Sequence, residues 1–134
     1  MSKNIAILAT EFHKESMDKM VKEVRKTASN QGLDVVKEVW VPGCYEVPLA
    51  LKRLFTSKNI DGAVILGIIE KGNTKHGLVM GLVVHNAIVR LEMETDKPVG
   101  MGILGPEILP RQIPLRLKPY AKRAVLALKT MLSI

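Results

Sequence analysis

Short apolar runs recur four times along the chain, and turn-forming or polar residues flank them. The run at residues 63–69, Ala-Val-Ile-Leu-Gly-Ile-Ile, contains no polar side chain, which is typical of a strand buried on both faces of a parallel sheet. Pro42 and Gly43 mark a turn after the second run, and residues 59–62 mark a turn before the third. We therefore predict four strands, at residues 4–10, 35–41, 63–69 and 98–104.

Between these runs, apolar residues recur at the three-to-four-residue spacing of helices. Gly32 follows the first such segment, as expected of a glycine that ends a helix. Residues 105–119 contain four prolines and are predicted to be mostly loop. The predicted helices span residues 17–28, 46–55, 74–94 and 120–132.

The predicted elements alternate strand and helix four times. Right-handed crossovers connect the parallel strands of such chains. We expect one α/β domain over residues 1–134, a three-layer α/β/α sandwich with a four-stranded parallel sheet in the flavodoxin-like order 2-1-3-4. In such sheets, ligands bind beyond the carboxyl ends of the strands.

The predicted helix at 74–94 is apolar on all sides, with residues such as Leu78, Leu82 and Val89 around its circumference. A helix of this kind must be covered all round. One side can pack on the sheet, so we expect the other side to contact another subunit of a homo-oligomer.

Composition narrows the class of protein. The chain has 134 residues, 47% of them hydrophobic, which is enough for a core without disulfides. It has one cysteine, Cys44, and no signal-peptide pattern, so we expect a cytoplasmic protein. Its apolar runs are shorter than the ~20 residues of a membrane helix, so no membrane partner is expected.

A net charge of +7 favours anionic partners. The basic residues are scattered and lack interleaved aromatics, so we expect no nucleic-acid partner. They are denser near the carboxyl terminus, where a specific small anion is the predicted ligand. The basic residues of that region are Arg111, Arg116, Lys118, Lys122 and Arg123.

Candidate chemistry clusters after the predicted strands. Gly72, Asn73 and Thr74 lie between a buried strand and a helix, where free backbone N–H groups bind an anion or, equally well, a side chain simply caps the helix. His76 follows in the first helical turn, as a proton carrier or as a surface histidine. Phe12 follows the first strand and either stacks on a flat heterocycle or covers the sheet. No spacing suits a metal, so we expect none.

Four segments, taken in order, resemble the successive motifs of the lumazine synthase family. They lie at residues 11–13, 40–48, 67–76 and 97–103 and cover nearly the whole chain. The second reads W-V-P-G-x-x-E-x-P and the third G-x-x-x-x-G-x-T-x-H, a combination more specific than either half. Residues 84–87 and 121–125 are most similar to the archaeal branch.

This resemblance implies condensation of 5-amino-6-(D-ribitylamino)uracil with 3,4-dihydroxy-2-butanone 4-phosphate. The products would be 6,7-dimethyl-8-ribityllumazine, phosphate and water, in the penultimate step of riboflavin biosynthesis. The family requires no cofactor. Its members assemble as pentamers, some into shells of pentamers, with each site at a subunit boundary.

The resemblance assigns one group of residues to the pyrimidine substrate. Phe12 would stack on the ring, while backbone groups at Ile68 and Ile69 would contact its edge. His13 stands where the family usually has asparagine, and Met101 where it often has an aromatic from the neighbouring subunit. The residues assigned to the ribityl chain and its surroundings are Gly43, Cys44, Tyr45, Glu46 and Lys122.

A second group is assigned to the phosphate and to proton transfer. Gly72, Asn73 and Thr74 would bind the phosphate, and His76 would relay protons. Arg116, before the last helix, matches the phosphate-binding arginine of the family, with Arg111 as its rival.

Two alternatives remain at this point. An archaeal-type riboflavin synthase shares this fold and consumes the lumazine, but it has no phosphate for residues 72–74 to bind. A non-catalytic lumazine-binding, flavin-binding or nucleic-acid-binding module on the same fold is the other alternative. Turnover of the two substrates separates both from the synthase.

Overall fold

The computed structural model describes residues 2–134 and shows a single parallel sheet with helices between its strands. The strands are β1 (Lys3–Thr10), β2 (Leu33–Val41), β3 (Gly62–Glu70) and β4 (Val99–Ile108). The helices are α1 (Lys14–Asn30), α2 (Val47–Phe55), α3 (His76–Thr95) and α4 (Leu117–Leu132). The strand order is β2-β1-β3-β4, so the predicted fold class and topology are confirmed.

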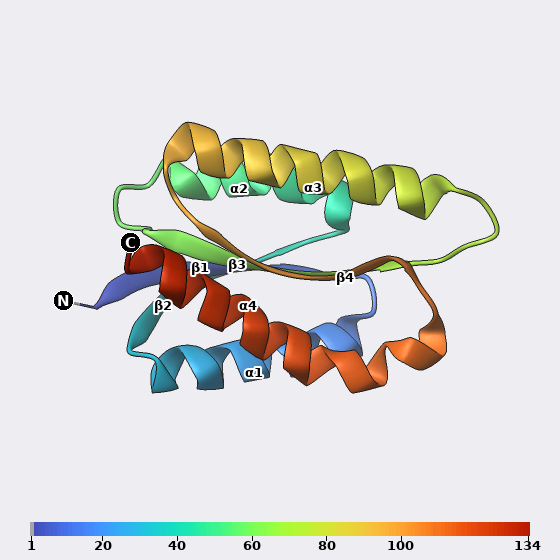
Figure 1. Cartoon of the computed structure of the whole chain (residues 1–134), viewed down its shortest axis with the longest axis horizontal. Helices are drawn as coiled ribbons and strands as arrows, with labels where there is room; N and C mark the ends of the chain where they lie inside the picture. The colour runs from blue at the N-terminus through green and yellow to red at the C-terminus, as the bar shows by residue number, and fades with distance from the viewer. Residues whose placement is uncertain (1) are drawn as a thin grey trace.

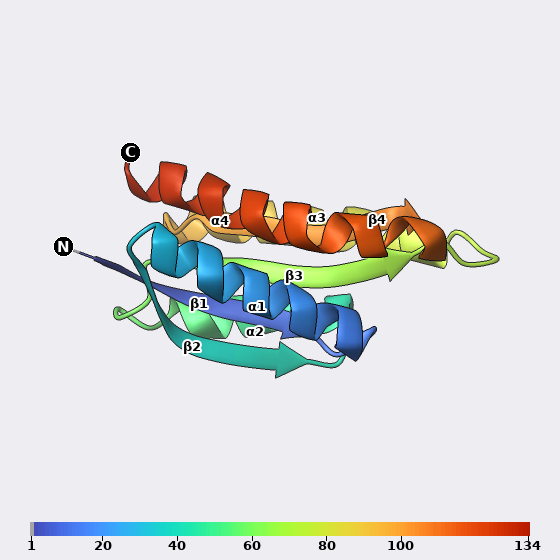
Figure 2. The ribbon, with the colours of Figure 1, turned by 90° about the horizontal axis from the view of Figure 1, so that it is seen from below.

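Helices cover both faces of the sheet (Figure 1). Helices α2 and α3 lie together on one face, and α1 and α4 lie on the other. Figure 2, seen from below, shows α1 and α4 side by side in front of the strands. All four strands run in one direction, so their carboxyl ends meet at one edge, at the right of Figure 1, where the loop after β3 extends.

The apolar run of β3 is explained by its central position. It is buried along its length up to Ile69 because β1 and β4 flank it and helices cover both of its faces. Val64 and Leu66 belong to the core beneath α1 and α4, whereas Ile65 and Ile69 belong to the core beneath α2 and α3. Successive side chains of β3 point to opposite faces of the sheet, so two separate cores pack against this one strand, as in other parallel sheets.

Helix α3 leaves an apolar surface exposed. It buries Gly81, Val84 and Ile88 against the rest of the chain, but much of its outer side is apolar as well. Despite this character, neither α3 nor another helix within residues 2–134 is both long and apolar enough to cross a bilayer. The exposed apolar residues, called here the α3 apolar face, are Val79, Leu82, Val83, Val89 and Met93.

The segment 105–119 is more regular than the sequence predicts. Strand β4 continues to Ile108, which pairs with Glu70, and two short 3-10 helices, Pro110–Gln112 and Pro114–Arg116, lead into α4. The prediction of a long loop was therefore wrong. Proline lacks an N–H, but a first helical turn does not need that donor, so prolines at the starts of these three helices disrupt nothing.

Candidate active site

A cavity of about 560 Å³ opens at the carboxyl edge of the sheet. Its volume is in the range of small-molecule sites. The walls come from segments that follow β1, β2 and β3 and from the first turns of α3, which the parallel topology brings together. The lining residues are Phe12, Pro42, Gly43, Cys44, Glu46, Ile68, Ile69, Glu70, Gly72, Thr74, His76, Gly77 and Met80.

Phe12 supplies the aromatic surface of the cavity. It lies just beyond β1, and its side chain is 50% exposed, unusually high for a phenylalanine. The ring of His13 packs edge-on against it, with centroids 4.3 Å apart and planes at 70°. An exposed ring held at a cavity wall is suited to stacking on a planar ligand.

The turn after β2 forms a second wall. Glu46 N–H donates to the Gly43 carbonyl at 3.2 Å, closing the short 3-10 helix Cys44–Glu46 that leads into α2. The Cys44 side chain is buried against β3 at Gly67, where a Cβ atom would lie 2.9 Å from its Sγ. Glycine at position 67 therefore makes room for the cysteine.

The surroundings of Cys44 make its thiol a poor nucleophile. Burial raises the pKa of its thiol to about 11, and the nearby Glu46 carboxylate adds to the rise. Only the thiolate is strongly nucleophilic, so the neutral thiol serves as part of the wall.

The loop at residues 72–74 leads into the amino terminus of α3. The Thr74 hydroxyl accepts a hydrogen bond from His76 N–H at 3.3 Å, so Thr74 closes the turn before the helix. Helix α3 is 20 residues long, and its dipole and free N–H groups favour negative charge at this end. Gly72 and Thr74 line the cavity, whereas Asn73 is exposed outside it. The geometry suits a phosphate or similar anion.

His76 begins α3 and lines the cavity beside Thr74. Tyr45 does not line the cavity, but its ring lies near that of His76 with centroids 6.0 Å apart at 62°. The imidazole is therefore placed next to the anion-binding turn, where a proton carrier is useful.

Glu70 lines the cavity at the end of β3, and sequence reasoning did not assign it a role. The His13 ring, which lies outside the lining, donates from Nε2 to Glu70 Oε1 at 3.1 Å. Pro42, Gly77 and Met80 were also unassigned. The sequence did hold a signal for Met80, since it follows His76 by one helical turn and so shares its face.

Several of the predicted site residues do not line the cavity. Met101, Arg116 and Lys122 do not line it, nor does Arg111. Helix α4, which carries Lys122, covers the opposite face of the sheet (Figure 1), and Arg116 Nη1 donates to the Gln112 carbonyl at 3.0 Å. Within residues 2–134 of one chain, the lining therefore contains no arginine or lysine.

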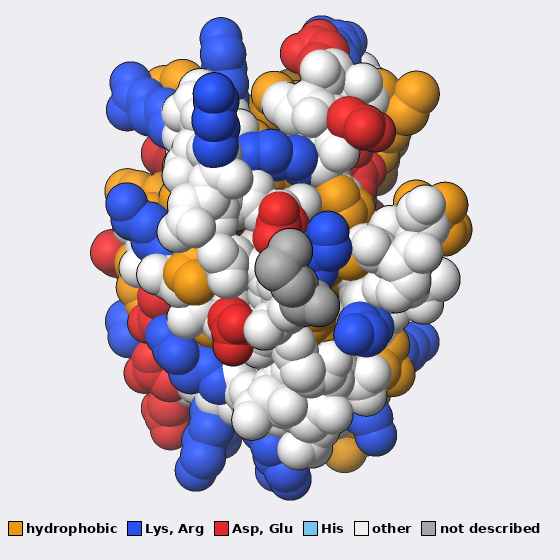
Figure 3. All heavy atoms as spheres, turned by 90° about the vertical axis from the view of Figure 1, so that its left-hand side faces the viewer, with side chains coloured by type: hydrophobic (Ala, Val, Ile, Leu, Met, Phe, Trp, Pro, Cys, Tyr) orange, Lys and Arg blue, Asp and Glu red, His pale blue; other side chains and the backbone are white. Residues whose placement is uncertain are grey.

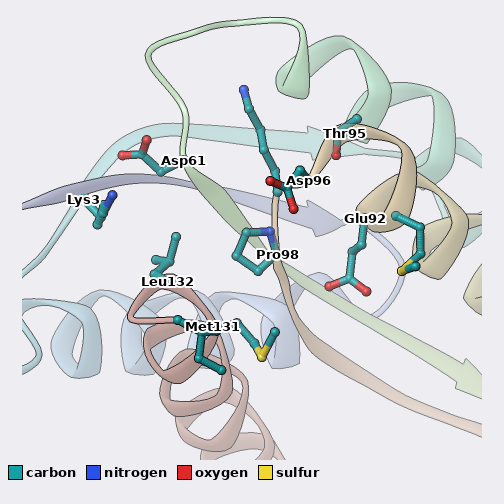
Figure 4. A pocket seen from close by; sticks show the side chains of 11 residues that line it. Lys3, Asp61, Glu92, Thr95, Asp96, Pro98, Met131 and Leu132 are labelled. Atoms are coloured by element: carbon teal, nitrogen blue, oxygen red, sulfur yellow. The ribbon is translucent and has the colours of Figure 1, made fainter.

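A larger hollow, of about 660 Å³, lies at the opposite end of the sheet. Figure 3 views this end, where basic and acidic side chains are interspersed with apolar ones. Charged groups such as Lys3, Asp61 and Glu92 border the hollow (Figure 4). Asp61 accepts a hydrogen bond from Asn4 N–H at 2.8 Å, and Glu92 accepts one from Val99 N–H at 2.7 Å. These carboxylates already stabilise the fold, and this is the amino-terminal edge, where ligands of parallel sheets do not bind.

Comparison with known proteins agrees with the carboxyl-edge site. The sequence model of the family described as 6,7-dimethyl-8-ribityllumazine synthase matches residues 2–134. Proteins of that name are similar to this chain: the one from Staphylothermus marinus is 34% identical over 96% of this chain and 86% of its own length. The Methanopyrus kandleri protein is 39% identical over 90% of this chain and 85% of its own length. The Methanococcus vannielii protein is 37% identical over 91% of this chain and 86% of its own length. The chain belongs to the 6,7-dimethyl-8-ribityllumazine synthase family.

Proposed function

We propose that the chain condenses 5-amino-6-(D-ribitylamino)uracil with 3,4-dihydroxy-2-butanone 4-phosphate to 6,7-dimethyl-8-ribityllumazine, the penultimate step of riboflavin biosynthesis. One observation carries this proposal: an aromatic platform, an anion-binding turn and a histidine lie in a single cavity of suitable size. Family membership supports it, and the relatives' names support neither riboflavin synthase nor a binding module.

Positioning supplies most of the catalysis in this proposal. The pyrimidine stacks on Phe12 with its edge along the backbone of Ile68 and Ile69, while the turn at Cys44–Glu46 holds the ribityl chain. The phosphate of the second substrate binds at residues 72–74. Holding the amine and the ketone together in this way converts a bimolecular reaction into an effectively unimolecular one.

The chemistry then needs only modest acid–base help. The 5-amino group attacks the ketone and water leaves as the imine forms. Phosphate departs, and the ribityl-bearing nitrogen closes the second ring with loss of another water. His76 lies beside the phosphate turn and carries protons for these steps. The substrate amine is the nucleophile, which agrees with a site whose thiol is kept neutral.

We further propose that the chain works as a cytoplasmic homo-oligomer, a pentamer or an assembly of pentamers, with each site at a subunit boundary. Two observations support this. The α3 apolar face is exposed in a single chain, with Met93 at 81% exposure. Met101, Arg116 and Lys122 do not line the cavity of their own chain, which agrees with a site that a neighbouring subunit completes with these three residues.

A turnover assay tests the reaction. Purified protein is mixed with both substrates, and the absorbance of the lumazine is followed against the uncatalysed background. We expect clear acceleration. A rate equal to the background would contradict the proposed reaction.

Mixing two variants tests the shared site. His76→Ala and Arg116→Ala each remove a group from a different side of the proposed boundary, so each alone is expected to be impaired. Subunit exchange between them should create some sites with both groups intact, and activity should recover in the mixture. If the mixture is no more active than its parts, the two residues do not meet across a boundary.

A further inference from the structure

Glu70 lines the cavity and His13 lies just outside the lining, and backbone hydrogen bonds next to each residue hold the pair in place. Glu70 ends β3, where the following residue, Lys71, donates its N–H to the Ile108 carbonyl at 2.8 Å. His13 precedes α1, and its carbonyl accepts a hydrogen bond from Met17 N–H at 2.9 Å. Groups with backbones fixed in this way are preorganised for binding.

The backbone at His13 is unusual in a way that favours this pairing. Its φ is 60° and its ψ is 49°, the left-handed conformation that asparagine, aspartate and histidine adopt more readily than other non-glycine residues. In this conformation the imidazole reaches Glu70 at 3.1 Å while its ring also packs edge-on against Phe12. One side chain thus contacts both the carboxylate and the aromatic platform.

Glu70 keeps acceptor capacity for a ligand. Its carboxylate makes one hydrogen bond within residues 2–134, from His13 to Oε1, and its side chain is 30% exposed. The neighbouring Lys71 ammonium lies 3.9 Å from Glu107 and not against Glu70. An ionised carboxylate accepts hydrogen bonds through both oxygens, so Oε2 remains open to a donor.

The charge of Glu70 indicates which ligand it contacts. A carboxylate two residues before the proposed phosphate turn repels a phosphate, so it does not serve that substrate. The aminouracil, in contrast, is rich in N–H donors on its amine and ring nitrogens. Hydrogen bonds from such donors to a charged acceptor are stronger than neutral ones.

We propose that Glu70 selects the amine substrate by accepting hydrogen bonds from its N–H donors, and that His13 is a positioning residue that holds the carboxylate and the Phe12 ring in place. This inference rests on the proposed function and deepens it. The 5-amino group is the donor that separates substrate from product, because it has lost both hydrogens once the lumazine ring has closed. The carboxylate therefore favours the reactant over the product.

Steady-state kinetics of three variants test the proposal. Glu70→Gln keeps the size of the side chain and removes the charge, His13→Asn removes the ring, and Glu107→Gln removes a charge at a nearby position outside the cavity lining. We expect Glu70→Gln to raise the KM of the aminouracil about tenfold, and His13→Asn about threefold. The KM of the butanone phosphate should stay within about twofold of the unaltered protein in both, and Glu107→Gln should change neither constant.

Other outcomes overturn the proposal. Unchanged constants in Glu70→Gln, or a rise confined to the butanone phosphate, would show that the carboxylate does not contact the amine. An equal change in Glu107→Gln would show a general charge effect. Melting temperatures of the variants identify any that fail to fold, and His13→Asn then serves as the second variant for the same KM comparison.

Calorimetric titration with the aminouracil alone tests the role of Glu70 independently of turnover. If the unaltered protein lacks turnover, the proposed function fails, but a Kd about tenfold weaker in Glu70→Gln would still support the role of the carboxylate. Equal Kd values, or no binding to the unaltered protein, would overturn it.

Discussion

The two ends of the sheet hold hollows of similar size but opposite character. At the amino end, several of the bordering polar groups already have partners in the chain: Lys97 Nζ donates to the Phe55 and Ser57 carbonyls at 2.9 and 2.7 Å, and Glu92 accepts from Val99 N–H. At the carboxyl end, the cavity is bordered by an exposed aromatic ring, the amino terminus of a long helix and the histidine that begins it.

This difference separates structural polar groups from functional ones. A buried or half-buried polar group whose partners belong to its own chain stabilises the fold. A polar group that faces a cavity with acceptor or donor capacity left over is available to a ligand. This difference favours the smaller hollow, and not the larger one, as the proposed active site.

The largest expected effect is on turnover at the carboxyl end. His76→Ala should lower kcat about 100-fold because it removes the proposed proton carrier beside the proposed phosphate turn. The melting temperature should change little, since the imidazole is at the surface of the cavity. Initial rates at saturating substrate measure the effect. A kcat within about threefold of the unaltered protein would remove His76 from the mechanism.

The opposite result is expected at the amino end. Lys97→Met should lower the free energy of unfolding by about 2 kcal/mol, because two carbonyls lose a charged donor, while kcat per folded molecule stays the same. Lys52→Met, at an exposed position on α2, is the matched control and should change stability by less than about 0.5 kcal/mol. Urea unfolding measures both. A loss of kcat per folded molecule in Lys97→Met would contradict this prediction, because it would show that the amino end also contributes to turnover.

A smaller gain in stability is expected just beneath the cavity. The Thr10 hydroxyl is buried and has no hydrogen-bond partner within residues 2–134. Thr10→Val replaces it with a methyl group of similar size and should raise the free energy of unfolding by about 1 kcal/mol. Thermal unfolding followed by circular dichroism provides the measurement. Destabilisation instead would show that the hydroxyl is hydrogen-bonded in solution.

The smallest expected effect concerns the chemical reactivity of the Cys44 thiol, which should be low. With a thiol pKa of about 11, only about one Cys44 in a thousand is ionised at pH 8. Alkylation of the folded protein by iodoacetamide should therefore be much slower than that of the urea-unfolded chain, and should accelerate as the pH rises toward 11. Mass spectrometry follows the modification. Equal rates in both states would mean that burial does not protect the thiol.

Much of the fold was predictable because it depends on local patterns. The unbroken apolar run of β3 marks a strand covered on both faces, and this placed the other elements around it. The region after Gly105 was not predictable in the same way. In a sequence, a proline within a strand cannot be told from a proline in a loop or at the start of a helix. Only the pairing of Ile108 with Glu70 in the structure shows that the strand continues past Pro106.

The candidate site was partly predictable for a related reason. Residues that follow strands, such as Phe12 and Thr74, meet at one edge in any parallel sheet, so their proximity follows from topology. Glu70 was missed because a lone glutamate at the end of a strand is an ordinary surface residue unless its partner is known. That partner, His13, is 57 positions away in the sequence. Arg116 was assigned through the family resemblance, and it does not line the cavity of its own chain.

A crystal structure of the protein with the aminouracil and inorganic phosphate tests the central claim most directly. We expect the pyrimidine to stack on Phe12, one of its N–H groups to lie within hydrogen-bond distance of Glu70, and the phosphate to bind at residues 72–74. Ligand in the hollow bordered by Asp61 and Glu92, with the carboxyl-edge cavity left vacant, would contradict the account.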